Sequence, residues 1–308
     1  MSKSDKFIFL KPPIKWVGGK TQILENVLNE FPEEIENYHE IFLGGGSVLL
    51  GLLSYIKKNK IVVNGTINAY DINYTLINLY KNIQNYPKEL YEKIKKLVSN
   101  LDFYDEKQMI TKPETFEDVD SKESYYYWIR QKYNKLEKEE YKTIKASALF
   151  LFLNKTCFRG LFRTGKNGFN VPYGHYKNPE IINEEHLFKI SELIKDVNFV
   201  CCDFKKSINN IKFGDFVYMD PPYAPENEKS FVGYTGDGFG LDKHLELFKL
   251  CEKLKNEKIK FLMSNSNVVL VRENFKDYYI TSIVCRRSIN SKKPDSKTKE
   301  VLIRSYKN

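Results

Sequence analysis

The sequence lacks the features that mark membrane, secreted and metal-binding proteins. No run of apolar residues approaches the roughly 20 that span a bilayer, and the apolar patch in MSKSDKFIFLKPP is too short for a secretory signal. The five cysteines form no CxxC pair and the four histidines are scattered, so no metal site is predicted. We therefore expect a soluble, cytoplasmic protein with reduced cysteines and no bound metal.

A complete nucleotide-phosphate loop is also missing. Residues 15–21 read KWVGGKT, which ends as such a loop does, but the first glycine of Gly-x-x-x-x-Gly-Lys-Ser/Thr would fall at Ile14. Two prolines interrupt the segment before it, where a buried strand should lie. An ATP or GTP site is thereby disfavoured, and we expect the two glycines to allow close approach of the backbone to neighbouring groups.

Positive charge is abundant and unevenly distributed. The 308 residues carry a net charge of +9. Segment 101–120 is acidic, whereas segment 121–179 has 12 Lys/Arg against four Glu, and segment 286–299 has six Lys/Arg against one Asp. Aromatic residues interleave the first basic segment. Two basic blocks beside aromatics favour a polyanion as partner.

Hydrophobic periodicity predicts an α/β protein. Helical spacing occurs at 20–30, 47–58, 75–99 (with a break at Pro87), 144–154 and 241–257. Strand-like runs occur at 38–43, 66–71, 197–202, 214–219, 258–264, 278–285 and 300–306. Alternating strands and helices predict a mostly parallel sheet covered on both faces, and the last two runs predict a closing antiparallel hairpin. The alternation lapses at 76–177, which predicts an inserted helical domain between 1–75 and 178–308.

A glycine loop follows the first strand-like run. In YHEIFLGGGS a strand leads into Gly44, Gly45 and Gly46, and a helix starts at Ser47. Glycines there allow a ligand to approach the backbone, and a plain tight turn is the alternative. The second strand, TINAYD, ends in Asp71, whose carboxylate suits the two hydroxyls of a ribose. The pattern fits an adenosine-type cofactor.

A carboxylate, two prolines and an aromatic ring follow the strand GDFVYM, as Asp220, Pro221, Pro222 and Tyr223. The prolines end the strand because neither can donate to the ladder. The Asp220 carboxylate and the Pro221 carbonyl could accept the two N–H bonds of an exocyclic amine on a nucleobase, while Tyr223 stacks on the base. A methyl donor placed in line would complete a displacement by positioning and electrostatics alone.

With these residues in view, the sequence resembles the Dam-type DNA adenine methyltransferases, in the class whose glycine motif precedes Asp-Pro-Pro-Tyr. Matching segments run through most of the chain: KWVGGK, FLGGGSV, DIN, LFLN, GFNVPYG, CCDF, DPPYAP, SNS and RRSI. The resemblance implies a Rossmann-like, seven-stranded S-adenosylmethionine-dependent methyltransferase sheet. It also implies that the inserted domain at 76–177 recognises the DNA target.

The resemblance implies S-adenosylmethionine as cofactor, with S-adenosylhomocysteine as product. It implies a cofactor-binding set of Trp16, Lys20, Phe42, Gly44, Gly46, Asp71, Asp203, Phe204 and Asp220. Within this set Asp71 would bind the ribose, and Asp203 and Phe204 would contact the adenine ring of the cofactor. Asp220 to Tyr223 would hold the target adenine, which must be flipped out of the duplex.

Double-stranded DNA is the implied partner, bound by a monomer or weak dimer. The implied DNA-binding residues are Lys15, Phe158, Arg159, Leu161, Arg163, Tyr176, Arg286 and Arg287. Lys15 would contact the first guanine, and Arg163 would read a base edge. The implied target is GATC, but Arg159 departs from the asparagine of Escherichia-like members, which leaves a related target such as GATATC open. An RNA or N4-cytosine methyltransferase is a further alternative, and a restriction nuclease is a candidate partner.

Overall fold

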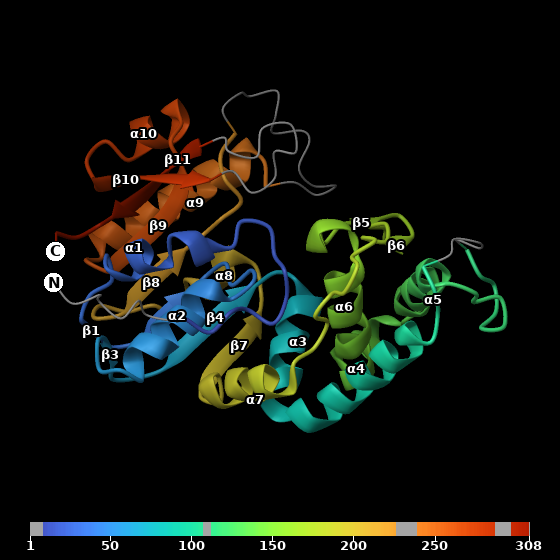
Figure 1. Ribbon diagram of the computed structural model, residues 1–308. Coiled ribbons are helices and arrows are strands. Elements are labelled where there is room, and N and C mark those ends of the chain that lie inside the picture. The colour runs from blue at the N-terminus through green and yellow to red at the C-terminus, as the bar shows by residue number, and fades with distance from the viewer. Residues whose placement is uncertain (1–8, 107–111, 226–238, 287–296, 308) are drawn as a thin grey trace, which may run out of the picture. The chain divides into compact units, whose positions relative to one another are not determined.

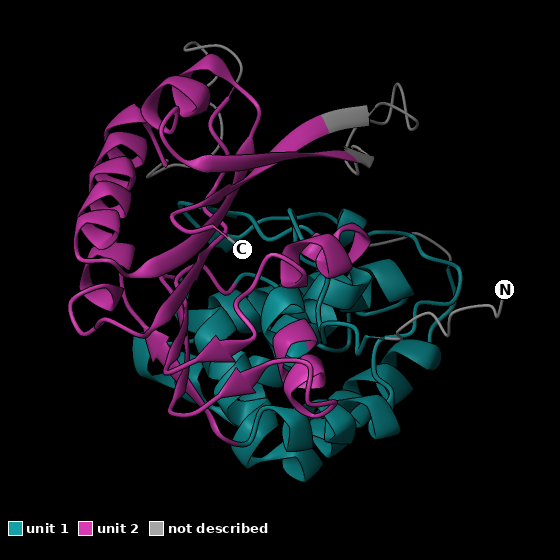
Figure 2. Cartoon of the chain, turned by 90° about the vertical axis from the view of Figure 1, so that its left-hand side faces the viewer, with its two compact units in different colours: residues 1–19, 44–50, 73–195 teal, residues 20–43, 51–72, 196–308 magenta. Residues whose placement is uncertain are grey.

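The computed structural model describes residues 9–106, 112–225, 239–286 and 297–307. The chain divides into two compact units (Figure 2). Unit 1, in teal, comprises residues 1–19, 44–50 and 73–195, and unit 2, in magenta, comprises residues 20–43, 51–72 and 196–308. Each unit is described separately below. The functional boundaries expected from the sequence, an inserted domain at 76–177, stay a prediction.

Seven strands of unit 2 form one mixed sheet in the order β10-β11-β9-β8-β2-β4-β7 (Figure 1). Their bounds are β2 Tyr38–Glu40, β4 Ile67–Asp71, β7 Val197–Cys201, β8 Phe216–Met219, β9 Lys260–Ser266, β10 Tyr279–Arg286 and β11 Lys297–Arg304. Only β11 among them runs antiparallel to its neighbours, β9 and β10. The predicted seven-stranded, mostly parallel sheet with an antiparallel hairpin is confirmed.

Short helices and one long helix complete unit 2. They are the 3-10 helix η1 Lys20–Gln22, α1 Leu24–Leu28, α8 Phe204–Ser207, α9 Leu241–Asn256 and α10 Val269–Asn274. Two short strands, β1 Glu34–Ile35 and β3 Val62–Val63, pair with each other in parallel. The core lies between α9 and the central strands, where Leu247, Cys251 and Leu254 pack with Phe261 and Met263. Burial of these apolar side chains supplies most of the stability of the unit.

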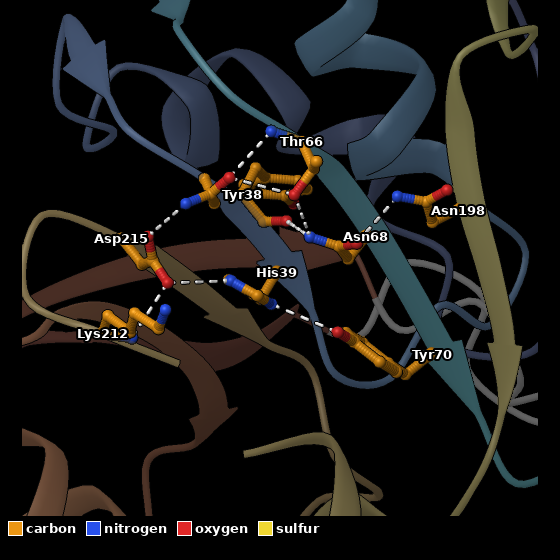
Figure 3. Close-up of polar contacts among 9 residues, drawn as sticks. Tyr38, His39, Thr66, Asn68, Tyr70, Asn198, Lys212 and Asp215 are labelled. Atoms are coloured by element: carbon orange, nitrogen blue, oxygen red, sulfur yellow. Dashed lines mark hydrogen bonds and ion pairs between the residues drawn. The ribbon is translucent and has the colours of Figure 1, made fainter. Parts of the chain in front are cut away.

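A buried polar network ties the neighbouring strands of the sheet together (Figure 3). The His39 ring in β2 lies 3.2 Å from Asp215 Oδ2 and 3.3 Å from the Tyr70 hydroxyl of β4. Asp215 also accepts from the Asn37 side-chain amide at 2.7 Å. Burial lowers the pKa of His39 although Asp215 opposes this, so we treat the contact as a hydrogen bond of a neutral imidazole. The network holds Asp215, directly before β8 Phe216–Met219, against β2.

Helices dominate unit 1. Their bounds are α3 Tyr74–Asn85, α4 Pro87–Asp102, α5 Lys122–Asn134, η2 Lys138–Lys142, α6 Ile144–Thr156, η3 Phe158–Gly160 and α7 Glu184–Leu193, and a hairpin joins β5 Thr164–Gly165 to β6 Gly168–Phe169. The predicted break at Pro87 is confirmed, because α3 ends at Asn85 and α4 starts at the proline. Helix α6 is buried almost all round, which is typical of a central helix.

Two helical predictions needed correction in length. The helix expected at 20–30 is a 3-10 turn followed by the five-residue α1, whose N-cap Ile23 makes no capping hydrogen bond from its side chain. The helix expected at 47–58 starts as predicted but ends two residues earlier, as α2 Ser47–Ile56. Its residues 47–50 belong to unit 1 and the rest to unit 2. In the described part of the chain, no helix is long and apolar enough to cross a membrane.

Candidate active site

Four predicted site residues follow or end four neighbouring parallel strands of unit 2, at the carboxyl ends of those strands. Asp220 follows β8, Phe42 lies two residues after β2, Asp71 ends β4, and Asp203 lies two residues after β7. The sheet order places β8 and β4 on opposite sides of β2, so the chain order reverses between β2 and β8. Ligands of open α/β sheets bind at such a switch point, outside the carboxyl ends of the strands.

Asp220 forms a buried ion pair with Lys20. The Lys20 Nζ atom lies 2.8 Å from Asp220 Oδ2, and the two side chains are 4% and 19% exposed. The second oxygen, Oδ1, is buried and has no hydrogen-bond partner among the described residues. An unsatisfied buried acceptor costs about 1–3 kcal/mol. The Asp220 carboxylate therefore has one oxygen held by a cation and one oxygen that an incoming N–H donor would satisfy.

The electrostatics of Asp220 are a balance of burial and charge. Burial raises the pKa of Asp220, while the Lys20 ammonium lowers it and the Glu300 carboxylate adds a smaller upward contribution. Lys20 is thus the main group that favours the ionised form of the buried Asp220 carboxylate. The sequence assigned Lys20 to the cofactor alone and did not indicate this pairing.

Tyr223 is held on two sides. Its hydroxyl donates to Glu300 Oε2 of β11 at 2.7 Å, and Lys20 Nζ lies 4.8 Å from the centre of its ring. Burial raises the pKa of the Tyr223 phenol, so the hydroxyl stays protonated and donates. The next residue, Ala224, donates its backbone N–H to Asn265 Oδ1 at 3.2 Å and accepts from the Ser266 hydroxyl. These contacts explain the SNS segment at the end of β9 as an anchor for the Asp-Pro-Pro-Tyr turn.

Glu40, at the end of β2, is a buried carboxyl group that the sequence interpretation missed. It is 2% exposed, and Tyr38 donates its hydroxyl to Glu40 Oε2 at 2.7 Å. Burial, helped by the charges of Asp220 and Asp71, raises the pKa of Glu40 to about 8, against the opposing Tyr38 hydrogen bond. Glu40 is therefore mainly protonated at neutral pH. An acidic residue inside an otherwise apolar strand run was the available signal.

Three aromatic rings gather beside the same strand ends. Phe42 lies 5.8 Å from Phe204 and 5.9 Å from Phe239 between ring centres, and Phe204 lies 5.7 Å from Phe239. Phe204 is 5% exposed, whereas Phe42 is only partly buried. The Asp203 carboxylate accepts from the Lys205 backbone N–H at 3.0 Å, which caps α8. The Asp203–Phe204 pair thus starts a helix at the ligand edge, and its contact with an adenine ring stays a prediction.

In unit 1 the glycine loop is shaped by two aromatic side chains. Gly44 and Gly46 have φ of +50° and +73°, a conformation that favours glycine. Tyr80 of α3 donates its hydroxyl to the Gly45 carbonyl at 2.7 Å, and a Cβ atom on Gly46 would collide with that hydroxyl. A Cβ atom on Gly45 would lie 2.8 Å from Trp16 Cβ. The middle glycine of FLGGG, Gly45, is therefore required by Trp16.

The KWVGGKT segment divides between the units after Gly19. The Trp16 ring stacks on Phe162 at 5.7 Å between centres, and Lys15 Nζ lies 4.1 Å above the Tyr176 ring. Gly18 has φ of +82° with no atom within 4 Å of the place of a Cβ, so close approach of the backbone is not its reason for being glycine. That expectation was wrong for Gly18, whose positive φ requires glycine instead.

Four of the predicted DNA-contacting residues of unit 1 lie between α6 and β6. Phe158 is 45% exposed, and the Arg159 guanidinium carbon lies 5.2 Å from its ring centre. Leu161 is half-buried. Arg163 is exposed and donates from Nε to Asn170 Oδ1 at 2.7 Å, so Asn170 sets the plane of its guanidinium. These four predicted residues are close in the sequence, and at least Phe158, Arg159 and Arg163 are exposed.

Two predicted residues cannot be placed in this way. Arg286 ends β10, but its side chain and all of Arg287 lie outside the described residues. Among the described residues, no group of three or more His, Cys, Asp or Glu side chains is arranged to hold a metal ion. The cysteines in that part of the chain, Cys157, Cys201, Cys202 and Cys251, are free thiols.

Comparison with known proteins gives a family match and several full-length relatives. The family model described as D12 class N6 adenine-specific DNA methyltransferase matches residues 16–289. The type II methyltransferase M.MjaIII of Methanocaldococcus jannaschii is 37% identical over 307 residues, covering 96% of this chain and 99% of that protein. The type II methyltransferase M1.LlaDCHI of Lactococcus lactis subsp. cremoris is 32% identical over 98% of this chain and 97% of its own length. A DNA adenine methylase of Haemophilus influenzae is 32% identical over 94% of this chain and 91% of its own length.

Proposed function

This chain belongs to the D12 class of N6 adenine-specific DNA methyltransferases, and we propose that its target adenine lies within GATC in duplex DNA. The reaction moves a methyl group to the exocyclic amine of adenine. The observation that carries the proposed mechanism is the Asp220 carboxylate, which has one oxygen paired with Lys20 and the other buried without a partner in the described chain. The amine of a flipped-out adenine would supply the missing donor.

Asp220 and Pro221 would together orient the amine. Asp220 Oδ1 accepts one N–H bond and the Pro221 carbonyl accepts the other, which directs the nitrogen lone pair away from both acceptors. The Tyr223 ring stacks on the base, and the bond from its hydroxyl to Glu300 holds the ring in place. Stacking of this kind contributes about 1–3 kcal/mol per base. The catalytic effect is then mainly orientation and preorganised charge.

Lys20 would keep Asp220 ionised during the reaction. An ionised carboxylate accepts a stronger hydrogen bond than a neutral one, and the amine becomes more acidic as it gains the methyl group. Asp220 Oδ1, which already holds an N–H bond of that amine, is placed to take its proton. Its raised pKa supports this role because a more basic carboxylate accepts a proton more readily.

The family implies S-adenosylmethionine, which supplies an electrophilic methyl group when bound. The residues present fit this cofactor. The glycine loop at 44–46 has backbone in conformations that leave no room for side chains, and Asp71 ends a parallel strand where a ribose diol can be bound. We propose that these residues hold the cofactor with Trp16, Lys20 and the predicted aromatic contacts at Phe42 and Phe204. No metal is expected to take part.

We propose that the segment 76–177 recognises the target, together with Lys15 and Tyr176. Phe158 and Leu161 would enter the base stack as the adenine leaves it. Arg163 would read guanine through its two major-groove acceptors, and its fixed fork supports this. Arg159 carries a second guanidinium beside the wedge, and this departure from the family pattern favours a related site such as GATATC as the second candidate.

Long-read mapping of modified bases in DNA from cells that express the chain tests the target directly. Methylated adenine confined to GATC would support the proposal, and methylation confined to GATATC would replace it with the second candidate. Modified cytosine, or activity on structured RNA above that on duplex DNA, would contradict the proposed substrate. Asp220→Ala should abolish transfer with an unchanged circular dichroism spectrum, and a near-normal rate in that variant would refute the amine-holding role.

A cognate restriction nuclease is the partner that we propose for the cellular role, because two of the relatives are named type II methyltransferases. Digestion of plasmid DNA from cells that express the chain provides a test. Plasmid DNA from cells expressing the chain should resist nucleases that cut the mapped site when it is unmodified, and full cleavage of that DNA would contradict a protective role.

A further inference from the structure

The backbone of Lys15 is clamped by a buried asparagine far along the chain. Asn154 lies near the end of α6 and is 0% exposed. Its Oδ1 atom accepts the Lys15 backbone N–H at 2.8 Å, and its Nδ2 atom donates to the Lys15 carbonyl at 2.8 Å. A single side-chain amide thus pairs with both backbone polar groups of one residue, as an adjacent strand would.

The same amide also reaches the turn that carries the predicted wedge. Asn154 Nδ2 donates to the Gly160 carbonyl at 3.1 Å, so its two N–H bonds are divided between Lys15 and Gly160. Arg159 and Gly160 have φ of +57° and +63°, which makes the turn tight. A Cβ atom on Gly160 would collide with the Lys15 side chain. Asn154 therefore fixes the distance and register between the Lys15 backbone and the wedge turn.

Such a clamp matters because lysine is a flexible side chain. A lysine head has several rotatable bonds, and its ordering costs up to about 2 kcal/mol of side-chain entropy. In this chain the Lys15 backbone is fixed by Asn154, and the Nζ end lies 4.1 Å above the Tyr176 ring. A functional group must be held to within about half an ångström to discriminate well. All the hydrogen-bonding capacity of the Asn154 amide nitrogen is used here.

We propose that Asn154 is a positioning residue for target recognition, which sets Lys15 against the Phe158–Leu161 turn and thereby determines discrimination at the first base pair of the site. This inference rests on the proposed function, in which Lys15 contacts that base pair. Asn154 itself touches neither the DNA nor the cofactor in this scheme. Its effect on specificity passes through the Lys15 backbone.

The test measures discrimination in purified full-length variants. The ratio of kcat/KM on a duplex with the mapped site to that on a duplex with the first base pair changed is compared for wild type, Asn154→Ala, Lys15→Ala and the double variant. Asn82→Ala is the matched control, because Asn82 is also buried and donates to Lys142 and Ser147 in the same unit. We expect Asn154→Ala to lower the ratio about tenfold, the double variant to equal Lys15→Ala, and the control to keep the wild-type ratio.

Other outcomes separate the clamp from the proposed function. If Lys15→Ala loses discrimination while Asn154→Ala keeps it, Asn154 is only structural and the inference is overturned. If Lys15→Ala keeps discrimination, the Lys15 assignment fails and the clamp has no role in specificity, while adenine methylation itself is judged by Asp220→Ala. Should Asn154→Ala fail to fold, Gly160→Ala displaces Lys15 from the other side, with Gly214→Ala as a control whose φ is also positive, at +95° against +63° for Gly160. Loss of discrimination in Gly160→Ala but not in Gly214→Ala supports the clamp. The same ratio of kcat/KM values in Gly160→Ala and Gly214→Ala refutes it.

Discussion

Lys20→Met is the most informative single change at the candidate active site. Methionine keeps the length and apolar stem of lysine but removes the ammonium that lies 2.8 Å from Asp220 Oδ2. Both oxygens of Asp220 would then be buried without a cation. Because Lys20 is the main cause that lowers the Asp220 pKa, its loss should raise that pKa further. The acid limb of the rate against pH should therefore move to higher pH.

The magnitude follows from the geometry of the pair. Two charges about 4 Å apart at an effective dielectric constant of about 20 interact by roughly 4 kcal/mol. Removing one partner of a buried pair costs about 3–5 kcal/mol, because the other charge stays uncompensated. A carboxyl group whose pKa is higher in the folded than in the unfolded chain binds its proton more tightly when folded. Its stabilising contribution is then complete at acidic pH and is lost as the pH rises through the folded pKa.

Thermal unfolding between pH 5 and 8 measures the effect of Lys20→Met on stability independently of activity. Lys20→Met should approach wild-type stability at pH 5 and fall below it toward pH 8. Lys205→Met is the matched control, because Lys205 pairs with Glu246 at 2.8 Å on an exposed surface of the same unit. That control should leave the pH dependence unchanged. Identical pH dependence in wild type and Lys20→Met, with only weaker cofactor binding by calorimetry, would show that Lys20 serves the cofactor alone.

Three further changes probe the neighbouring contacts. Glu40→Gln should be more stable than wild type at alkaline pH, because wild type loses the stabilising protonated form of Glu40 as the pH rises through its pKa of about 8. The measurement is the difference in unfolding midpoint between variant and wild type, and the same difference at pH 6 and at pH 9 would contradict this. Tyr223→Phe releases the ring from Glu300 and should raise KM for DNA roughly tenfold with a smaller effect on kcat in steady-state kinetics, and a fall in kcat alone would be evidence against a positioning bond. Gly45→Ala places a Cβ atom 2.8 Å from Trp16 and should destabilise the chain by about 1–3 kcal/mol in denaturant unfolding, a loss that Trp16→Ala should partly relieve.

The strand pattern was predictable because the central strands are buried. Parallel strands covered on both faces read as nearly continuous apolar runs, as the fully buried β8 does, whereas the edge strand β7 begins with alternating buried and exposed residues. The strands β4, β7 and β8 all lie within two residues of their predicted bounds. The helices α5 and α7 were not predicted. Helix α5 carries charged and aromatic residues on several faces, and its start depends on Ser121 and Ser124, which exchange capping hydrogen bonds. Local propensity alone gave a weak signal there.

The sequence predicted which residues lie at the strand ends of the candidate site, but it did not predict which side chains they contact. Asp220 could be found because a carboxylate before two prolines stands out at the end of an apolar strand. Glu300 could not, because it lies on β11 among alternating polar residues and meets Tyr223 only when the antiparallel strand enters the sheet. Asn154 pairs with a residue 139 positions away. Contacts at such separation follow from tertiary packing, and no local pattern encodes them.

The segment KWVGGKT contributes residues to two different sets of contacts, one in each unit. Its first two residues are held in unit 1, where Asn154 pairs with Lys15 and the Trp16 side chain leaves room only for glycine at position 45. Its lysine at position 20 is held in unit 2 by Asp220. A phosphate loop would need its glycines to present backbone N–H groups to a ligand, whereas Gly18 is required here by its positive φ in open surroundings. The two lysines have different neighbours, Tyr176 for Lys15 and Asp220 for Lys20, so substitution of each lysine should produce a different defect.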